Sequence, residues 1–147
     1  MDRNTIVAQA TPLGRSGIAV IRLSGPESFN YTKEITHFSG ETPHHTIRLL
    51  TIYDNKNRKI DEAIFAFYQA PRSYTGEDVV EISCHGNPQI SERIINRLTK
   101  LGASLAQPGE YTRRAFLNGK IENRYQKFEN DYSVSYTHLT LPTNREV

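Results

Sequence analysis

The 147-residue sequence predicts an α+β domain, built as a mixed, largely antiparallel sheet with two main helices. Two observations support this fold class. Several segments alternate apolar and polar side chains with the period of a strand, and polar turns separate them. One later segment has the 3.6-residue period of an amphipathic helix instead. The predicted order is strand, strand, helix, strand, strand, strand, helix.

The first part of the domain is predicted to contain two strands and a short helix. Residues 5–10 and 18–24 alternate as strands, and a loop containing glycine and proline separates them. Pro26 then indicates the start of a helix over 26–35, because proline is favoured at the first helical position.

Three further strands follow this helix. Residues 46–54 and 59–70 are predicted strands, and the polar stretch DNKNR between them is typical of a hairpin. These two strands should therefore pair antiparallel. Residues 77–86, EDVVEISCHG, form the fifth predicted strand.

The amphipathic helix follows the fifth strand. Asn87 is placed to cap its amino terminus, and Gly102 is placed to end it. The segment after Gly102, up to Lys120, has mixed irregular and helical character. One face of the helix is apolar and consists of Ile90, Ile94, Ile95, Leu98 and Leu101.

Composition restricts the class of protein. The formal net charge is only +2, from 18 basic and 16 acidic residues, so the basic surface of a dedicated nucleic-acid-binding protein is not expected. The single cysteine, Cys84, excludes an internal disulfide framework and suits a reducing cytoplasm. No secretory leader and no run of about 20 apolar residues is found, which predicts a soluble cytoplasmic chain without a membrane partner.

Two predicted strands carry a charge near the middle. Arg22 shares a strand face with Val20, and Glu81 shares one with Ser83. Arginine and glutamate are almost never fully buried unless they are paired. The pattern alone therefore favours two exposed charges or a structural ion pair between Arg22 and Glu81.

Other chemistry-bearing residues have structural interpretations. Cys84 precedes His85, and a neighbouring imidazolium can activate a thiol by lowering its pKa. Adjacent strand residues point to opposite faces, however, so the sequence favours a buried, inert Cys84 thiol. The five histidines show no metal-ligand spacing, and no metal is predicted. The Gly-Lys pair at Gly119 and Lys120 is followed by Ile121 and lacks the upstream glycine of a nucleotide-binding P-loop.

Three longer motifs together resemble one family. TIVAQATPLGRSGIAVIRLSGP, APRSYTGEDVVEISCHGNP and QPGEYTRRAFLNGKI are similar, in order and spacing, to the amino-terminal domain of the MnmE (TrmE) tRNA-modification GTPases. The resemblance spans residues 1–121, which we interpret as one domain. It implies the fold of the aminomethyltransferase folate-binding module, binding of a tetrahydrofolate such as 5-formyltetrahydrofolate, and a constitutive homodimer.

The resemblance also implies a role in a larger enzyme. Members of the family modify the wobble uridine of tRNA at C5, and they act with an FAD-dependent partner of the MnmG type. They bind GTP, with potassium and magnesium, in a GTPase domain that this sequence does not contain. The chain is therefore not expected to hydrolyse GTP by itself.

The positions that contact folate in the family match Arg22, Glu81 and Lys120. A pterin presents a ring N–H beside an exocyclic amino group, so one carboxylate such as Glu81 can accept two parallel hydrogen bonds from it. Arg22 and Lys120 can donate to carbonyl oxygens or to the carboxylates of the glutamate tail. Two alternatives remain. The charges can form a structural ion pair, and the chain can be a pure dimerisation domain whose interface is the sheet edge and the amphipathic helix.

The tail, residues 122–147, departs from the family. Residues 134–143, VSYTHLTLPT, are compatible with translation of a transposon-end adapter used in sequencing libraries. We hypothesise that residues from 134 on are translated adapter, and we expect a disordered tail with few contacts to the core. Amplification across the locus from source DNA would test this, and a native reading frame ending in THLTLPTNREV would show the hypothesis to be wrong.

Overall fold

The computed structural model describes residues 4–120, and the predicted tail lies outside the described residues. The α+β prediction is confirmed: a six-stranded, mostly antiparallel mixed sheet packs with three helices. The elements are β1 (Ile6–Gln9), β2 (Ile18–Ser24), α1 (Ser28–Thr36), β3 (Thr46–Tyr53), β4 (Lys59–Tyr68), β5 (Val79–His85), α2 (Pro88–Leu101), β6 (Ser104–Leu105) and α3 (Glu110–Leu117).

The strands lie in the order β3-β4-β5-β2-β1-β6, and only the β1–β6 pair is parallel. The predicted hairpin between β3 and β4 is present. Its turn is held by Asp54, whose carboxylate accepts the backbone N–H groups of Lys56 and Arg58 at 2.8 and 2.9 Å. Strands that follow one another in the chain pair antiparallel at β1–β2, β3–β4 and β4–β5, and these pairs make up most of the sheet.

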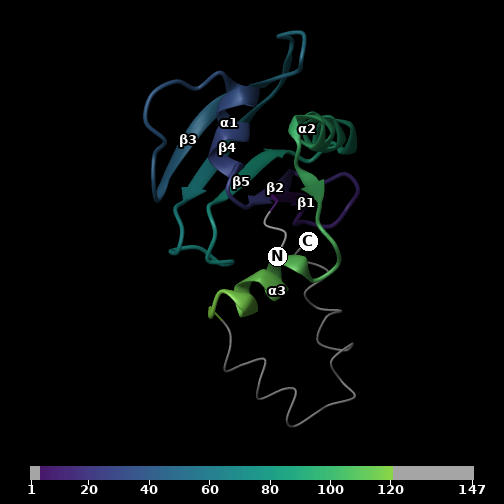
Figure 1. The fold of residues 1–147 in the computed structure, drawn as a ribbon. Helices are drawn as coiled ribbons and strands as arrows, with labels where there is room; N and C mark the ends of the chain where they lie inside the picture. The colour runs from purple at the N-terminus through teal and green to yellow at the C-terminus, as the bar shows by residue number, and fades with distance from the viewer. Residues whose placement is uncertain (1–3, 121–147) are drawn as a thin grey trace.

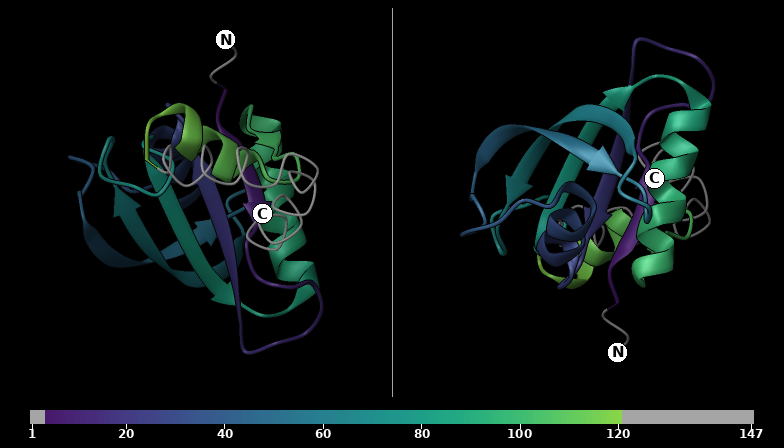
Figure 2. Two further views of the ribbon diagram at one scale, coloured as in Figure 1. Left: turned by 90° about the horizontal axis from the view of Figure 1, so that it is seen from below. Right: turned by 90° about the horizontal axis from the view of Figure 1, so that it is seen from above.

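The helices cover the two faces of the sheet unequally. α1 and α2 lie on one side of the sheet and α3 lies on the other (Figures 1 and 2). The core is the layer between the sheet and α1 and α2, and alternate residues of the central strands point into it. Its fully buried side chains include Ile21, Leu23, Ile35, Phe65, Val80, Ile82, Ile94 and Leu98.

The ends of α2 are formed by the residues that the sequence predicts. The Asn87 side-chain oxygen accepts the backbone N–H of Gln89 at 2.9 Å, and Pro88 occupies the first turn. Gly102 ends the helix with φ 127°, a conformation that glycine adopts without a Cβ clash. The apolar face of α2 packs into the core through Ile94 and Leu98.

Helix α1 begins two residues later than predicted. Ser28 is its first residue, and its backbone N–H bonds the Gly25 carbonyl at 3.2 Å, so Pro26 belongs to a turn before the helix. Gly25 has φ 138°, and a Cβ there would lie 2.5 Å from Thr5 Cα. The close crossing of this turn over the start of β1 sets where the helix begins.

Residues 104–120 contain two elements that the sequence did not resolve. β6 is only two residues long and pairs with β1 through bonds such as Ser104 N–H to the Thr5 carbonyl at 2.9 Å. α3 follows after Gly109, whose φ of 73° turns the chain into the helix. Within residues 4–120, no helix is long and apolar enough to cross a membrane.

Candidate functional site

The antiparallel pairing of β2 with β5 brings Arg22 and Glu81 together. They are direct partners in the register, so their side chains leave the same face of the sheet. The Arg22 Nε and Nη2 atoms each lie 2.9 Å from Glu81 Oε2. The side chains are 16% and 28% exposed, so this ion pair remains in contact with solvent.

Two tyrosine rings flank the Arg22 guanidinium. Its central carbon lies 5.5 Å from the ring centre of Tyr111 and 5.9 Å from that of Tyr74, within the range of a cation–π contact. Tyr111 is fully buried, and its hydroxyl donates to the Arg22 carbonyl at 2.6 Å. Burial raises the pKa of Tyr111 well above its ordinary value, so the phenol stays a donor. Tyr74 is 42% exposed and leaves part of its ring accessible beside the ion pair.

Lys120 lies against the loop that carries Tyr74. Its Nζ donates to the Pro71 carbonyl at 3.2 Å, and its backbone N–H donates to the Ala115 carbonyl at 2.8 Å. Among residues 4–120, Lys120 makes no hydrogen bond to Arg22 or Glu81. The structure therefore brings two of the three predicted site residues into contact and connects the third to them through the β4–β5 loop, residues 69–78.

A buried polar cluster fixes this loop and α3 on the sheet. Arg114 lies at its centre, with Nη1 3.2 Å from Glu77 Oε1 and 2.8 Å from the Asn4 carbonyl, and Nη2 3.0 Å from Glu110 Oε2. The Ser24 hydroxyl also donates to Glu77 Oε1, at 2.7 Å. These contacts tie β2, the β4–β5 loop and α3 together around the Arg22–Glu81 pair.

Cys84 and His85 point to opposite sides, as the strand pattern predicts. The Cys84 thiol is buried and donates to the Ala19 carbonyl at 3.4 Å. Burial, with a smaller contribution from the charge of Asp61, raises the pKa of Cys84 to about 11, which makes the thiol unreactive at neutral pH. His85 is exposed and pairs through Nδ1 with Asp61 at 2.8 Å. The described residues contain no group of three His, Cys, Asp or Glu side chains that could hold a metal ion.

Comparison with known sequences gives the family. The profile of the family described as GTP-binding protein TrmE N-terminus matches residues 5–120. The chain belongs to the TrmE amino-terminal family. Its relatives are tRNA modification GTPases named MnmE: that of Nitratiruptor sp. is 44% identical over 121 residues, that of Aquifex aeolicus 44% over 120, and that of Thermotoga maritima 45% over 120. These alignments cover 81–82% of this chain and 26–27% of each relative, so the chain spans about a quarter of their length.

The three TrmE-like motifs converge on the site in space. The first supplies Arg22 and the second supplies Tyr74 and Glu81. The third supplies Tyr111, which flanks Arg22, and Lys120, which contacts the β4–β5 loop at Pro71. The site prediction from single residues missed both tyrosines.

The buried Arg114 cluster was missed as well. One signal for it was present in the sequence, because Glu110 and Arg114 stand four residues apart, the spacing of an ion pair on one helix face. The partner that holds this pair on the sheet, Glu77, lies 37 residues before Arg114 and has no sequence signal.

Proposed function

We propose that this chain binds a tetrahydrofolate, such as 5-formyltetrahydrofolate, through Arg22, Glu81 and Lys120, and that it forms a homodimer. The observation that supports binding is a part-exposed ion pair beside an accessible aromatic ring, that of Tyr74. The flat face of a pterin would pack against the ring while the charged groups bind its polar edge.

The donor and acceptor chemistry of the site fits a pterin. The Arg22 Nε and Nη2 atoms both contact Glu81 Oε2, and a carboxylate has about four acceptor sites, so Glu81 can also accept ligand N–H groups. Arg22 and Lys120 would meet carbonyl oxygens or the carboxylates of the glutamate tail. When bound, the folate would supply a one-carbon unit. The residues of this chain bind and orient it.

A pure dimerisation domain is the second candidate, because the Arg22–Glu81 pair closes without a ligand. Titration of the chain with 5-formyltetrahydrofolate in a calorimeter separates the two. Micromolar binding supports the folate module, and no heat from a folded dimer supports the dimerisation domain.

Replacing Glu81 with glutamine should weaken folate binding by about 1 to 3 kcal/mol, because one charged acceptor becomes an amide donor. The affinity is measured by calorimetry on both proteins. Glu62→Gln, on the exposed part of β4, is the matched control and should bind like the wild type. Equal affinities of Glu81→Gln and wild type would refute the role of Glu81.

Replacing Arg22 with lysine should also reduce folate affinity, because an ammonium cannot reproduce the planar fork of a guanidinium. Affinity and thermal unfolding are measured together for Arg22→Lys and Arg22→Ala. If Arg22→Lys binds normally while Arg22→Ala only unfolds, the structural ion pair is the better account.

The open part of the sheet supports the proposed homodimer. α3 covers only part of its face, and Ile47, Leu49 and Ile64 on β3 and β4 are 70%, 63% and 48% exposed there. Neighbouring large apolar side chains on one face are typical of an interaction surface. The apolar residues of α2, by contrast, pack into the core. We therefore place the proposed dimer contact on this open face of β3 and β4.

This surface continues into the folate site. Along one row of the sheet, Ile47 pairs with Ala66, Ala66 with Glu81, and Glu81 with Arg22. A second copy that covers Ile47 and Leu49 would therefore lie close to the ligand. Folate binding and dimerisation are expected to strengthen one another.

Sedimentation equilibrium should give twice the monomer mass for the wild-type chain. Leu49→Lys should shift the equilibrium to monomer, because it places a charge in the apolar contact. Leu13→Lys is the control, since Leu13 is the same kind of side chain and is also exposed, at 86%, but lies in the β1–β2 loop. A wild-type monomer at all concentrations would overturn the dimer proposal.

We further propose that the chain is a module of a cytoplasmic GTPase that modifies the tRNA wobble uridine at C5. The FAD-dependent MnmG-type partner, the tRNA and GTP with potassium and magnesium belong to the action of the longer protein. The support is the family match, together with relatives named tRNA modification GTPase MnmE. The chain alone is expected to release no phosphate from GTP in a turnover assay.

A further inference from the structure

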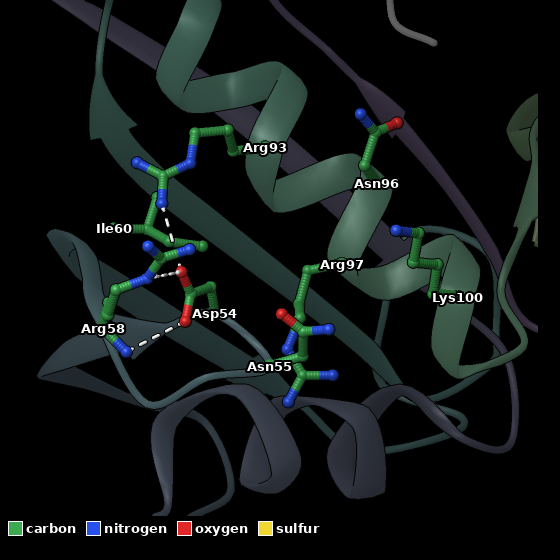
Figure 3. Close-up of a pocket in the computed structure, with 8 residues that line it drawn as sticks. All are labelled: Asp54, Asn55, Arg58, Ile60, Arg93, Asn96, Arg97 and Lys100. Carbon is green, nitrogen blue, oxygen red and sulfur yellow. Dashed lines mark hydrogen bonds and ion pairs between the residues drawn. The ribbon is translucent and has the colours of Figure 1, made fainter.

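A basic pocket lies on the other side of the molecule, between α2 and the β3–β4 hairpin. Its volume is about 260 Å³, several times the about 30 Å³ that one molecule of liquid water occupies. Arg93, Arg97 and Lys100 reach it from α2, and Asp54 and Arg58 reach it from the hairpin (Figure 3). The pocket is large enough for a small oxyanion with bound water.

The pocket contains more positive charge than its own carboxylate can neutralise. Four cations against one carboxylate give a formal charge of +3. Asp54 is occupied already: Arg58 Nε lies 3.0 Å from its Oδ2, and Arg93 lies 3.5 Å from the same atom. The backbone N–H of Arg58 outweighs the effect of burial and lowers the pKa of Asp54, so this carboxylate stays charged.

Arg97 and Lys100 have no ion-pair partner among residues 4–120. The Arg97 Nε atom is buried and lacks a hydrogen-bond partner there, which is costly for a charged donor. Arg93 and Arg97 also stand four residues apart on one helix, a spacing at which like charges repel. A cation in the last turn, such as Lys100, interacts favourably with the helix dipole. This interaction does not explain the buried Nε of Arg97, which is unpaired within the described part of the chain.

We propose that this pocket binds a phosphate group, held by the side chains of Arg97 and Lys100. A tetrahedral oxyanion offers acceptors in several directions, and an arginine fork matches two of them at once. It would neutralise part of the positive charge that lines the pocket, and it would lower the repulsion between Arg93 and Arg97 along α2. The phosphate comes from a small free ion or from the backbone of a nucleic acid. This site is separate from the Arg22–Glu81 site, and it does not depend on the folate proposal.

The test is a titration of the full 147-residue chain with inorganic phosphate. The chemical shifts of the backbone amides are monitored by NMR, and sodium chloride keeps the ionic strength constant. We expect saturable shifts at the amides of Arg97, Lys100 and Arg58. Arg97→Gln and Lys100→Gln should each weaken binding about tenfold, as loss of one charge-assisted hydrogen bond implies. Arg113→Gln, an exposed arginine on α3, should leave binding unchanged.

A second titration with a short RNA stem-loop identifies the source of the phosphate. The ligand is a backbone phosphate if the RNA shifts the same amides and if Arg97→Gln makes the dependence of log affinity on log salt shallower, its slope falling in magnitude by about one. If only inorganic phosphate shifts them, the ligand is a small free ion. The proposal is overturned if neither probe shifts these amides, or if Arg113→Gln weakens binding as much as Lys100→Gln does. Lys100 is exposed, so its variant remains informative even if Arg97→Gln fails to fold.

Discussion

Replacing Arg114 with methionine is expected to lower the free energy of unfolding by about 3 to 5 kcal/mol, the usual cost of removing one partner of a buried ion pair. The Arg114, Glu77 and Glu110 side chains are only 10%, 11% and 16% exposed. Without the guanidinium, two neighbouring carboxylates would lack their cation, and the Asn4 carbonyl would lose its donor.

Urea unfolding followed by circular dichroism measures this loss. Arg113→Met is the matched control, because the next residue of the same helix is exposed, and a surface change of this kind usually stays within about 0.5 kcal/mol. The double variant Arg114→Met with Glu77→Gln should recover part of the stability. If Arg114→Met lowers the free energy of unfolding by less than about 1 kcal/mol, the two carboxylates become hydrated in the variant, and the cluster behaves as a surface ion pair.

Replacing Tyr111 with alanine is expected to cost a similar amount, about 3 to 5 kcal/mol, because a large, fully buried ring is removed from between α3 and the sheet. The Arg22 guanidinium would also lose one of its two flanking rings. Folate affinity should therefore fall together with stability.

Tyr111→Phe separates the ring from its hydroxyl. It keeps the packing and removes only the bond to the Arg22 carbonyl, so about 1 kcal/mol is expected. Both variants are measured by thermal unfolding and by folate titration. Equal losses from alanine and phenylalanine would mean that the hydrogen bond, and not the ring, holds α3.

The strands and α2 could be predicted because local signals specify them. The alternation in β2 and β5 follows from burial of one sheet face, and Asn87 and Gly102 mark the ends of α2 by their own chemistry. The alternation also explains why Arg22 and Glu81 could be recognised as unusual. Their direct pairing could not be derived from it, because alternation fixes the face of a residue and leaves the register open.

The remainder of the site depends on tertiary contacts. α3 is eight residues long, too short to be stable by itself, and it is helical where Tyr111 and Arg114 find partners on the sheet. β6 has only two residues, which give no period to detect. Lys120 was identified through the family resemblance alone, and its role in binding stays a prediction.

The parallel pairing of β6 with β1 has a consequence for synthesis of the chain. Ile6 of β1 pairs with Ser104, 98 residues later, so the outer edge of β1 stays open until the end of the domain leaves the ribosome. At about 5 to 20 residues per second, this delay lasts roughly 5 to 20 seconds. An open strand edge can pair with another chain during that time. We therefore expect nascent chains that stop before residue 104 to depend on chaperones far more than the finished domain does.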